Sequence, residues 1–407
     1  MGDAESVRGS GFVERTRVAA ARETLRAETT VSTGTEDVPL EAADGRVLAQ
    51  TVTSPTNVPD FPRAAMDGYA VRAEDTFGAA SRSPETLQVH ESDPGPEQAT
   101  WVHTGSPVPE PGDAVVKTEQ ATEIGEQVEI TQAVAEGQNV SNVGEDLEAG
   151  QHLFDPGHRL RPSDLGLLRS VEIESVTVKA SPTVAVIPTG EELVESDPDP
   201  GEAIETNGIM VSSLVERWGG DAIYRNVVTD DREALAAAIE SDLDADVIVT
   251  TGGSSIGKRD LLPEVVEGMG ALLAHGVALK PGHPVALGLV KETPVLMLPG
   301  YPVACIVNAW QFVRPMINWT MDTEPDEPAR ISAQLNRKIR SEPGVRSCVR
   351  VTVDQSGDAV HAEPVSESGA SILSSVSLAD GWVQVPESIE GYDAGDTVTV
   401  EFWEAQP

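Results

Sequence analysis

The sequence predicts a multidomain protein in which an α/β domain with a parallel-rich sheet is flanked along the chain by two β modules. The first observation is the length of 407 residues, which corresponds to two or three domains at about 150 residues each. The second is a change in hydrophobic period along the chain. The third is the placement of Gly and Pro, which bound short β-type runs near both ends and longer apolar strands between them.

Two separate segments, 13–55 and 150–180, are expected to form one mixed α/β domain. Residues 13–27 (VERTRVAAARETLRA) are mostly good helix formers and predict a helix. Residues 56–149 carry short β-type runs such as TLQVH, DAVVKTE and QVEITQAV. The economical explanation is that the two outer segments pack together and that 56–149 is an inserted β module.

Strands alternate with helices in the central region, 181–325. The runs TVAVIPTG, DAIYRNVV, ADVIVTTGG and PVLMLPG predict apolar strands, and 210–218 and 233–239 show helical patterns. This alternation predicts a mainly parallel sheet with both faces covered. From 329 to 407 the alternating runs CVRVTV, WVQVP and TVTVEFW indicate a second small β domain.

Acidic residues dominate the composition, with 67 Asp and Glu against 28 Lys and Arg and a formal net charge of −39. Such a charge makes free nucleic acid an unsuitable partner. Self-repulsion on this scale is tolerable in molar salt, where the Debye length falls to about 3 Å. We expect a halophilic protein; a merely acidic mesophilic protein is the alternative.

Neither a membrane segment nor a disulfide framework is expected. The sequence has no apolar run of bilayer length and no charged-then-apolar leader, so we expect a cytoplasmic protein without membrane contact. Its two cysteines, Cys305 and Cys348, have neither CxxC nor zinc-ligand spacing. Both are interpreted as buried thiols.

The segment DVIVTTGGSSIGKRD, residues 246–260, is the most informative for chemistry. A buried strand opens onto Gly252 and Gly253 and then Ser254, and small residues there let backbone N–H groups approach an anion. Asp260 precedes a helical pattern. It is therefore either a helix cap or a ligand, and the sequence does not separate the two.

Carboxylates follow three of the predicted strands. Glu192 belongs to PTGEEL, Asp231 follows the strand expected to end at Val228, and Asp260 follows the glycines. Hard oxygen ligands beside a phosphate-bearing substrate are what Mg²⁺ uses. The alternative for Glu192 and Asp231 is a solvated acidic turn.

Basic residues are scarce, and several fall close together in the central region. These are Lys258, Arg259, His275, Lys280 and His283. The Pro-Gly turn after Lys280 would aim its ammonium group at an anion, although a turn with a solvated lysine is the alternative. In so acidic a chain a local basic pocket would concentrate anionic ligands.

Seven motifs occur in a fixed order: AMDGYA, HTGSPVP, GED, PTGEEL, TTGGSSIGKRD, LKPGHP and LPGYPV. Each is weakly specific alone. Together they cover about residues 13–405 and resemble the molybdopterin molybdenumtransferase family, which includes MoeA and the E domain of gephyrin. With its acidic composition, the chain is expected to be a haloarchaeal-like member.

The resemblance implies a four-part protomer: the mixed domain, a β-barrel-like insertion, an α/β domain related to molybdopterin adenylyltransferase, and a C-terminal β-barrel. It implies a homodimer whose active cleft lies between the α/β domain of one subunit and the insertion of the other. The implied reaction inserts molybdate into adenylylated molybdopterin, with hydrolysis of the AMP–phosphate bond, and requires Mg²⁺.

The resemblance also implies site residues. The catalytic positions would be Asp67, Glu192, Asp231, Asp260 and Lys280, with Glu192, Asp231 and Asp260 holding Mg²⁺. The substrate-binding positions would be Thr104, Asp146, Gly252, Gly253, Ser254, Lys258, His283, Pro299 and Gly300.

Several positions depart from the family pattern. Ser141, Gly276 and His283 stand where the family often has cations, Tyr301 replaces an asparagine, and Ala370 replaces a serine. Fewer fixed cations could mean altered oxyanion preference, weaker substrate binding, or adaptation to high salt.

Three other functions fit the same residues. A tungstate-inserting paralogue cannot be separated by sequence, because the two oxyanions are nearly isosteric. A non-catalytic pterin-binding scaffold would explain the missing cations but not the retained carboxylates. An adenylyltransferase is the least favoured, because the surrounding modules match the insertase.

Overall fold

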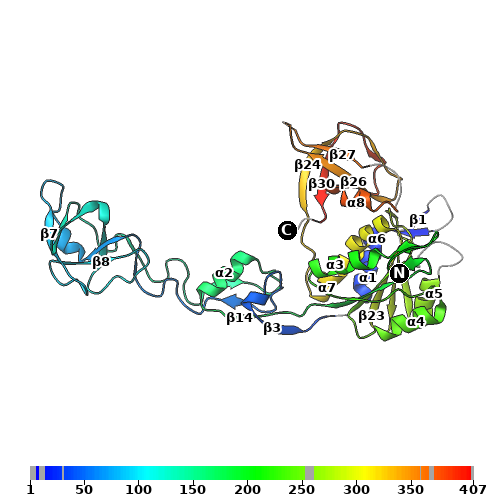
Figure 1. Ribbon diagram of the computed structural model, residues 1–407, viewed down its shortest axis with the longest axis horizontal. Helices are drawn as coiled ribbons and strands as arrows, with labels where there is room; N and C mark the ends of the chain where they lie inside the picture. The colour runs from blue at the N-terminus through cyan, green and yellow to red at the C-terminus, as the bar shows by residue number, and fades with distance from the viewer. Residues whose placement is uncertain are drawn as a thin grey trace. The chain divides into compact units, whose positions relative to one another are not determined.

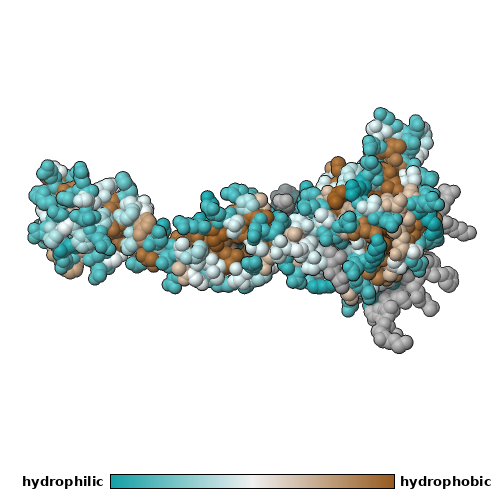
Figure 2. Space-filling model, turned by 90° about the horizontal axis from the view of Figure 1, so that it is seen from below, coloured by the Kyte–Doolittle hydropathy of each residue, from teal (hydrophilic) through white to brown (hydrophobic). Residues whose placement is uncertain are grey.

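The computed structural model describes residues 6–8, 14–29, 32–252, 261–357, 359–365 and 371–404. The chain divides into two compact units, one formed by Met1–Thr35 with Lys179–Pro407 and the other by Glu36–Val178. Each unit has hydrophobic cores of its own. Hydrophilic residues cover most of the face drawn in Figure 2, as a net charge of −39 requires.

An α/β sheet forms the centre of the first unit, with strand order β18-β15-β19-β23-β22-β20 in the described residues. The first four strands are parallel and the last two antiparallel. Their bounds are β15 (Thr183–Pro188), β18 (Asp221–Tyr224), β19 (Val247–Thr251), β20 (Ala271–His275), β22 (Ala286–Val290) and β23 (Thr293–Leu298). Every residue of β19 and β23 is buried, which explains why both strands consist of apolar residues with threonine only at their ends.

Helices cover both faces of this sheet (Figure 1). Residues of α4 (Arg232–Ser241) and α5 (Leu261–Met269) share one apolar core with β15, β19 and β23. On the opposite face α3 (Asn207–Arg217) contacts α6 (Pro302–Asn308), which continues through a π-helical turn, Ala309–Val313, into α7 (Arg314–Thr320). The short strands β16 (Leu193–Val194) and β17 (Ala203–Ile204) pair with each other in parallel.

The C-terminal part of the first unit is a closed β-barrel. Its strands follow the order β26-β27-β24-β30-β28, and pairing of β26 with β28 closes the ring. The bounds are β24 (Ala329–Leu335), β26 (Arg346–Asp354), β27 (His361–Pro364), β28 (Gly381–Val385) and β30 (Thr397–Phe402). The barrel also carries the strand pair β25 (Ile339–Arg340) and β29 (Gly391–Tyr392) and the turn α8 (Ser374–Ser377).

Two contacts join this barrel to the α/β layer. Strand β21 (Leu279–Lys280) pairs in parallel with β26, placing Lys280 opposite Ser347. The Trp310 ring of the π-helical turn lies 5.5 Å from the Trp382 ring of the barrel in an edge-on contact. Trp382 in turn stacks on Trp403 at 5.4 Å. The space between the two layers is therefore bounded by fixed elements on both sides.

The second unit, Glu36–Val178, contains a six-stranded sheet of order β10-β11-β7-β8-β6-β9. Its strands are β6 (Gly68–Val71), β7 (Glu85–Val89), β8 (Gln98–Val102), β9 (Ala114–Lys117), β10 (Ala121–Ile124) and β11 (Gln127–Ile130). Segments before and after this sheet also pair: β4 (Val52–Thr53) with β13 (His152–Phe154), and β3 (Thr35–Pro39) with β14 (Ser175–Lys179). Helix α2 (Pro162–Ser170) packs beside them.

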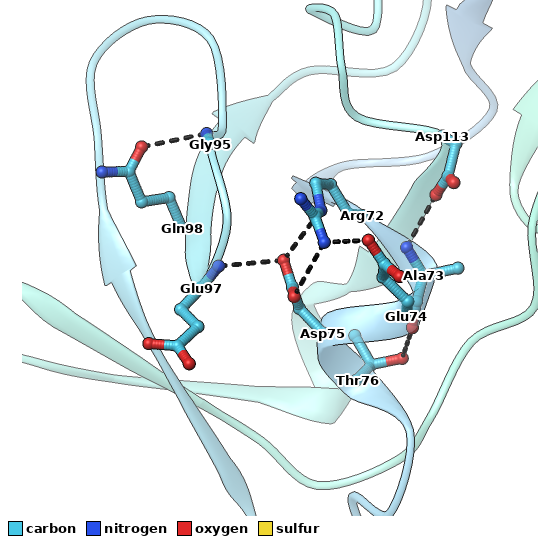
Figure 3. Close-up of polar contacts among 9 residues, drawn as sticks. All are labelled: Arg72, Ala73, Glu74, Asp75, Thr76, Gly95, Glu97, Gln98 and Asp113. Carbon is cyan, nitrogen blue, oxygen red and sulfur yellow. Dashed lines mark hydrogen bonds and ion pairs between the residues drawn. The ribbon is translucent and has the colours of Figure 1, made fainter.

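Charged side chains hold the turn after β6 against the neighbouring loops (Figure 3). Arg72 Nε lies 3.3 Å from Asp75 Oδ2, and the same oxygen accepts from the N–H of Glu97 at 2.9 Å. Asp113 Oδ1 accepts from the N–H of Ala73 at 2.7 Å. These contacts fix the far end of β6, whose near end carries Asp67.

Two local expectations were wrong. The first helix, α1 (Val18–Glu28), begins later than residue 13, because Glu14–Thr16 forms a strand (β2) paired with β1 (Ser6–Arg8). The strand expected to reach Val228 ends at Tyr224, and Val228 makes only an isolated bridge to Thr189. The strands on either side of Asp67 do not pair with each other: β5 (Arg63–Ala64) pairs with β12 (Val140–Ser141), whereas β6 pairs with β8 and β9.

Other local expectations are confirmed. The predicted helical patterns appear as α3, α4 and α5, and the three C-terminal runs appear as β26, β28 and β30. Cys305 and Cys348 are free and buried, and burial raises the pKa of the Cys348 thiol to about 12. In the described part of the chain, no helix combines the length and apolarity that crossing a bilayer requires.

Candidate functional site

Three loops meet where the parallel strands β15, β19 and β23 end. The N–H of Gly252 donates to the carbonyl oxygen of Leu298 at 3.0 Å. Gly252 has φ +134°, and a Cβ there would lie 2.1 Å from the carbonyl oxygen of Thr189. A Cβ on Gly300 would lie 3.6 Å from the Cα of Gly252. Glycine at position 252 is therefore required for the close packing of the three loops.

This packing changes the role expected for Gly252. The sequence predicted that its backbone N–H group would cradle an anion, but that N–H is already bonded to Leu298. Gly252 instead lets the strand ends approach each other. Gly253, Ser254, Lys258 and Asp260, which were expected to complete this loop, lie outside the described residues.

Buried polar atoms face the same strand ends without partners. Among the described residues, the hydroxyl oxygens of Thr189 and Thr251 and the Oδ1 atom of Asn207 have no hydrogen-bond partner. The amide of Asn207 is held in place because its Nδ2 donates to the carbonyl oxygen of Gly300 at 2.7 Å. Buried polar groups that lack partners cost about 1–3 kcal/mol each. A polar ligand at the strand ends would recover that energy.

Glu205 and Tyr224 brace the start of α3 beside Asn207. One carboxylate oxygen of Glu205 accepts from the N–H of Gly208 at 2.7 Å, and the other accepts from the Tyr224 hydroxyl at 2.5 Å. Burial and this hydrogen bond to the carboxylate raise the pKa of Tyr224 to about 12. The tyrosine therefore remains a neutral donor at physiological pH, and α3 is held in register.

Glu192 and Asp231 belong to loops at this edge of the sheet. The Glu192 carboxylate folds back over Gly190, where an added Cβ would lie 3.0 Å from either carboxylate oxygen. Asp231 caps α4: its Oδ1 accepts from the N–H groups of Glu233 and Ala234, both at 3.0 Å. Capping therefore explains part of the role of Asp231.

The carboxylates of Glu192 and Asp231 are compatible with binding of Mg²⁺. Among the described residues, no three His, Cys, Asp or Glu side chains form a metal-binding group. Mg²⁺, however, usually takes only one or two protein carboxylates and completes its shell with water and substrate phosphates. Glu192 and Asp231 supply carboxylate oxygens of the required hard type.

A cavity of about 480 Å³ lies between the KPG turn and the barrel, within the range of about 300–1,000 Å³ typical of ligand pockets. The sequence-predicted residues Lys280, His283 and Pro299 line it. So do three cations that the sequence analysis did not single out: Lys338, Arg340 and Arg350. Positive charge is thus concentrated around one cavity of an acidic protein.

Arg350 is the buried cation of this cavity. Its side chain projects from β26 and the residue is only 9% exposed. Its Nε atom has no hydrogen-bond partner within the described residues. Burial lowers the pKa of this guanidinium, yet the group stays charged at neutral pH. A desolvated guanidinium that lines a cavity is a strong site for an oxyanion.

The remaining predicted residues belong to the unit Glu36–Val178. Asp67 Oδ1 accepts hydrogen bonds from the backbone N–H and the hydroxyl of Thr104, at 2.7 and 2.9 Å. Asp146 lies in the turn after β12, where its N–H donates to the carbonyl oxygen of Val58 at 2.9 Å. These residues are exposed, so Asp67 presents an oriented carboxylate to solvent.

Comparison with known proteins gives matches along almost the entire chain. Family models match in order: the MoeA N-terminal region (domain I and II) at residues 16–171, the "Probable molybdopterin binding domain" at 185–319, and the MoeA C-terminal region (domain IV) at 332–403. This order defines a multidomain protein of molybdenum cofactor biosynthesis. The chain belongs to the MoeA family, and it is a transferase.

Individual relatives agree with this assignment. The molybdopterin molybdenumtransferase of Bacillus subtilis is 32% identical, with 90% of this chain and 89% of that protein covered. The enzyme of the same name from Haemophilus influenzae is 30% identical, with 94% and 97% covered. A crystal structure of the molybdopterin biosynthesis MoeA protein from Pyrococcus horikoshii matches with a TM-score of 0.81 and 30% identity, covering 95% of this chain and 100% of that one.

Proposed function

We propose that this protein is a molybdenum insertase, which transfers molybdate into the dithiolene of adenylylated molybdopterin with release of AMP. The observation that carries the proposal is that the cation-rich cavity and the strand ends are adjacent, because the consecutive residues Pro299 and Gly300 belong to one each. Pro299 lines the cation-rich cavity, and Gly300 packs beside Gly252 at the strand ends. An oxyanion and a phosphate-bearing substrate would therefore bind in adjacent places.

The cavity supplies the oxyanion end of this site. Lys280 and Arg350 carry fixed positive charge into a chain whose net charge is −39. Burying the Arg350 guanidinium without a partner for Nε costs free energy, which a bound dianion offsets. Molybdate and tungstate have the same charge and nearly the same shape, so both are expected to bind.

The strand ends supply the pterin and phosphate end. Thr189, Thr251 and Asn207 offer buried polar oxygens to the substrate. Glu192, Asp231 and Asp260 would hold Mg²⁺, which when bound neutralises charge on the phosphate oxygens as water hydrolyses the AMP–phosphate bond. Lys280 would offset the negative charge of the departing phosphate or of the oxyanion.

The second unit would complete the site in a homodimer. In this arrangement Asp67, Thr104 and Asp146 come from the inserted module, 56–149, of the partner subunit. The α/β domain, 181–325, provides the other residues predicted from the sequence, and the barrel domain, 329–407, provides Arg350. The segments 13–55 and 150–180 make up the rest of the protomer. The oriented carboxylate of Asp67 supports a place for this residue in the site.

Molybdate binding to an Arg350→Met variant tests the oxyanion end. Because a charged hydrogen-bond donor is removed, we expect the affinity to fall by about tenfold to a hundredfold. Thermal stability is expected to stay equal or rise, since an apolar side chain replaces a buried cation. Arg169→Met, which removes an exposed arginine paired with Glu174 in the other compact unit, is the matched control. Unchanged affinity in Arg350→Met would place the oxyanion elsewhere.

A further inference from the structure

We propose that His283 binds the oxyanion of the cavity only as an imidazolium, so that each bound oxyanion brings one proton into the site. The inference rests on the proposed function, because it takes the cavity as the oxyanion site. It adds a property that a lysine at the same position would not confer: binding that depends on pH near neutrality. The ligand class is a tetrahedral dianion.

The position of His283 is fixed by its surroundings. Its carbonyl oxygen accepts from the N–H of Val277 at 2.9 Å. The preceding Gly282 has φ +113°, and Asn308 Nδ2 of α6 donates to its carbonyl oxygen at 2.9 Å. An added Cβ on Gly282 would lie 2.1 Å from that same nitrogen. The turn is thus held against α6, and the imidazole lines the cavity with Lys280.

Charged groups approach His283 from several elements. The positive charge of Arg15 disfavours protonation of the imidazole. Arg15 belongs to β2, which lies beside the segment that follows β20. Arg350 of β26 and Arg340 of β25 line the same cavity, as does Lys338, whose ammonium group lies 2.6 Å from Asp393 Oδ1. Among the described residues, the negative charge of Glu342 raises the pKa of the imidazole. The titratable Tyr301 and Cys348 also line the cavity.

In the empty cavity these surroundings favour the neutral imidazole. Burial and the positive charge of Arg15 lower the pKa of His283, and Glu342 offsets only part of this. A dianion beside the ring would act in the opposite direction and raise the pKa. Between the two pKa values the empty site is neutral and the occupied site is protonated. Over that interval affinity falls about tenfold for each unit of rising pH.

Lysine at this position would behave differently, because its ammonium group stays charged throughout the neutral range. The cavity would then bind an oxyanion with nearly constant affinity. With histidine, the protein holds the anion tightly at lower pH and releases it more readily at higher pH. His283 is therefore a residue that tunes oxyanion affinity to the proton concentration.

Calorimetric titration with sulfate, whose charge is constant over the neutral range, tests the inference. We would titrate the full-length protein at constant ionic strength between about pH 6 and about pH 8, on either side of the ordinary histidine pKa. Two buffers with different ionisation enthalpies report the protons taken up. The expected result is an affinity that falls as pH rises, with uptake approaching one proton per anion.

Substitutions at His283 test whether this residue takes up the proton when the anion binds. His283→Lys is expected to bind sulfate tightly at all these pH values, and His283→Gln weakly at all of them, both without proton uptake. His361→Gln, a histidine of β27 that does not line the cavity, should behave as the wild type. The proposal is overturned if His283→Gln retains the pH dependence, or if the wild type binds without taking up a proton.

The outcomes separate this proposal from the function on which it rests. One outcome is that the wild type binds sulfate with an affinity independent of pH and that Arg350→Met does not bind it. This result would support the oxyanion cavity and reject the role of His283. Absence of sulfate and molybdate binding at every pH would reject both.

Discussion

One oxygen of the Asp67 carboxylate, Oδ1, accepts two hydrogen bonds from Thr104, from the backbone N–H at 2.7 Å and from the hydroxyl at 2.9 Å. Both partners are exposed, so these bonds, rather than burial, orient the carboxylate. They also lower the pKa of Asp67, first through the backbone bond and then through the side-chain bond. Asp67 therefore stays ionised to a lower pH than an ordinary aspartate.

Thr104→Val is expected to raise the pKa of Asp67 toward its ordinary value. The substitution removes the hydroxyl donor and keeps the backbone donor, so the shift should be partial. Carboxyl-carbon NMR titration measures it directly. Thr118→Val is the matched control, because the Thr118 hydroxyl donates to the backbone oxygen of Asp67 and not to its carboxylate. Equal pKa values in wild type and Thr104→Val would show that the hydroxyl bond does not stabilise the ionised carboxylate.

Mixing two inactive variants tests whether one active site uses both subunits. Asp67→Asn and Glu192→Gln should each abolish turnover as homodimers. If the two residues meet across the dimer, a heterodimer contains one doubly substituted site and one intact site. Random re-association of equal amounts should then restore about a quarter of wild-type activity. No recovery, despite confirmed subunit exchange, would mean that both residues serve the same subunit.

Gly252→Ala should disrupt the strand ends. The new Cβ would overlap the carbonyl oxygen of Thr189, and φ at this position is positive. We expect a loss of about 2 kcal/mol or more in the free energy of unfolding, together with weaker substrate binding. Gly268→Ala, in α5 with open space around its Cβ position, should be neutral or slightly stabilising. Denaturant unfolding of both variants measures the change in stability. If Gly252→Ala is as stable as the wild type, the close approach of position 252 to Thr189 does not require glycine.

Two substitutions at Asp231 separate capping from metal binding. Asn retains the capping oxygen, so Asp231→Asn should be as stable as the wild type, whereas Asp231→Ala should lose about 1 kcal/mol. Because both remove the negative charge, both should lose Mg²⁺-dependent turnover. Thermal unfolding and the dependence of rate on Mg²⁺ concentration provide the two readouts. Full activity in Asp231→Asn would leave Asp231 as a cap alone.

The α/β layer could be predicted from sequence because its strands are buried on both faces. Runs such as TVAVIP and VIVTT contain no charged residue, and their only polar residues are threonines at the ends of the strands; the loops after them carry Gly and Pro. The chain order of strands and helices then determines that Thr189, Gly252 and Gly300 lie at one edge. The sequence also indicated Lys280 and His283, because cations are rare in this chain.

Arg350 and Asn207 could not be singled out in this way. Arg350 occupies one position in an alternating strand, RSCVRVTVD, and its burial depends on pairing of β26 with β21 and β28, which are distant in sequence. The available signal was an arginine sharing the strand face of the buried Cys348. Asn207 has no distinguishing signal in the sequence, and only the contact with Gly300 places it at the strand ends.

The measurement that tests the central claim most directly is the release of AMP from adenylylated molybdopterin by the purified protein in concentrated KCl. The assay would be run with and without Mg²⁺, and with molybdate, tungstate or no oxyanion. Release that requires both Mg²⁺ and an oxyanion is the predicted result. Tight binding of the pterin without release of AMP under any of these conditions would contradict the insertase and favour a non-catalytic pterin-binding protein.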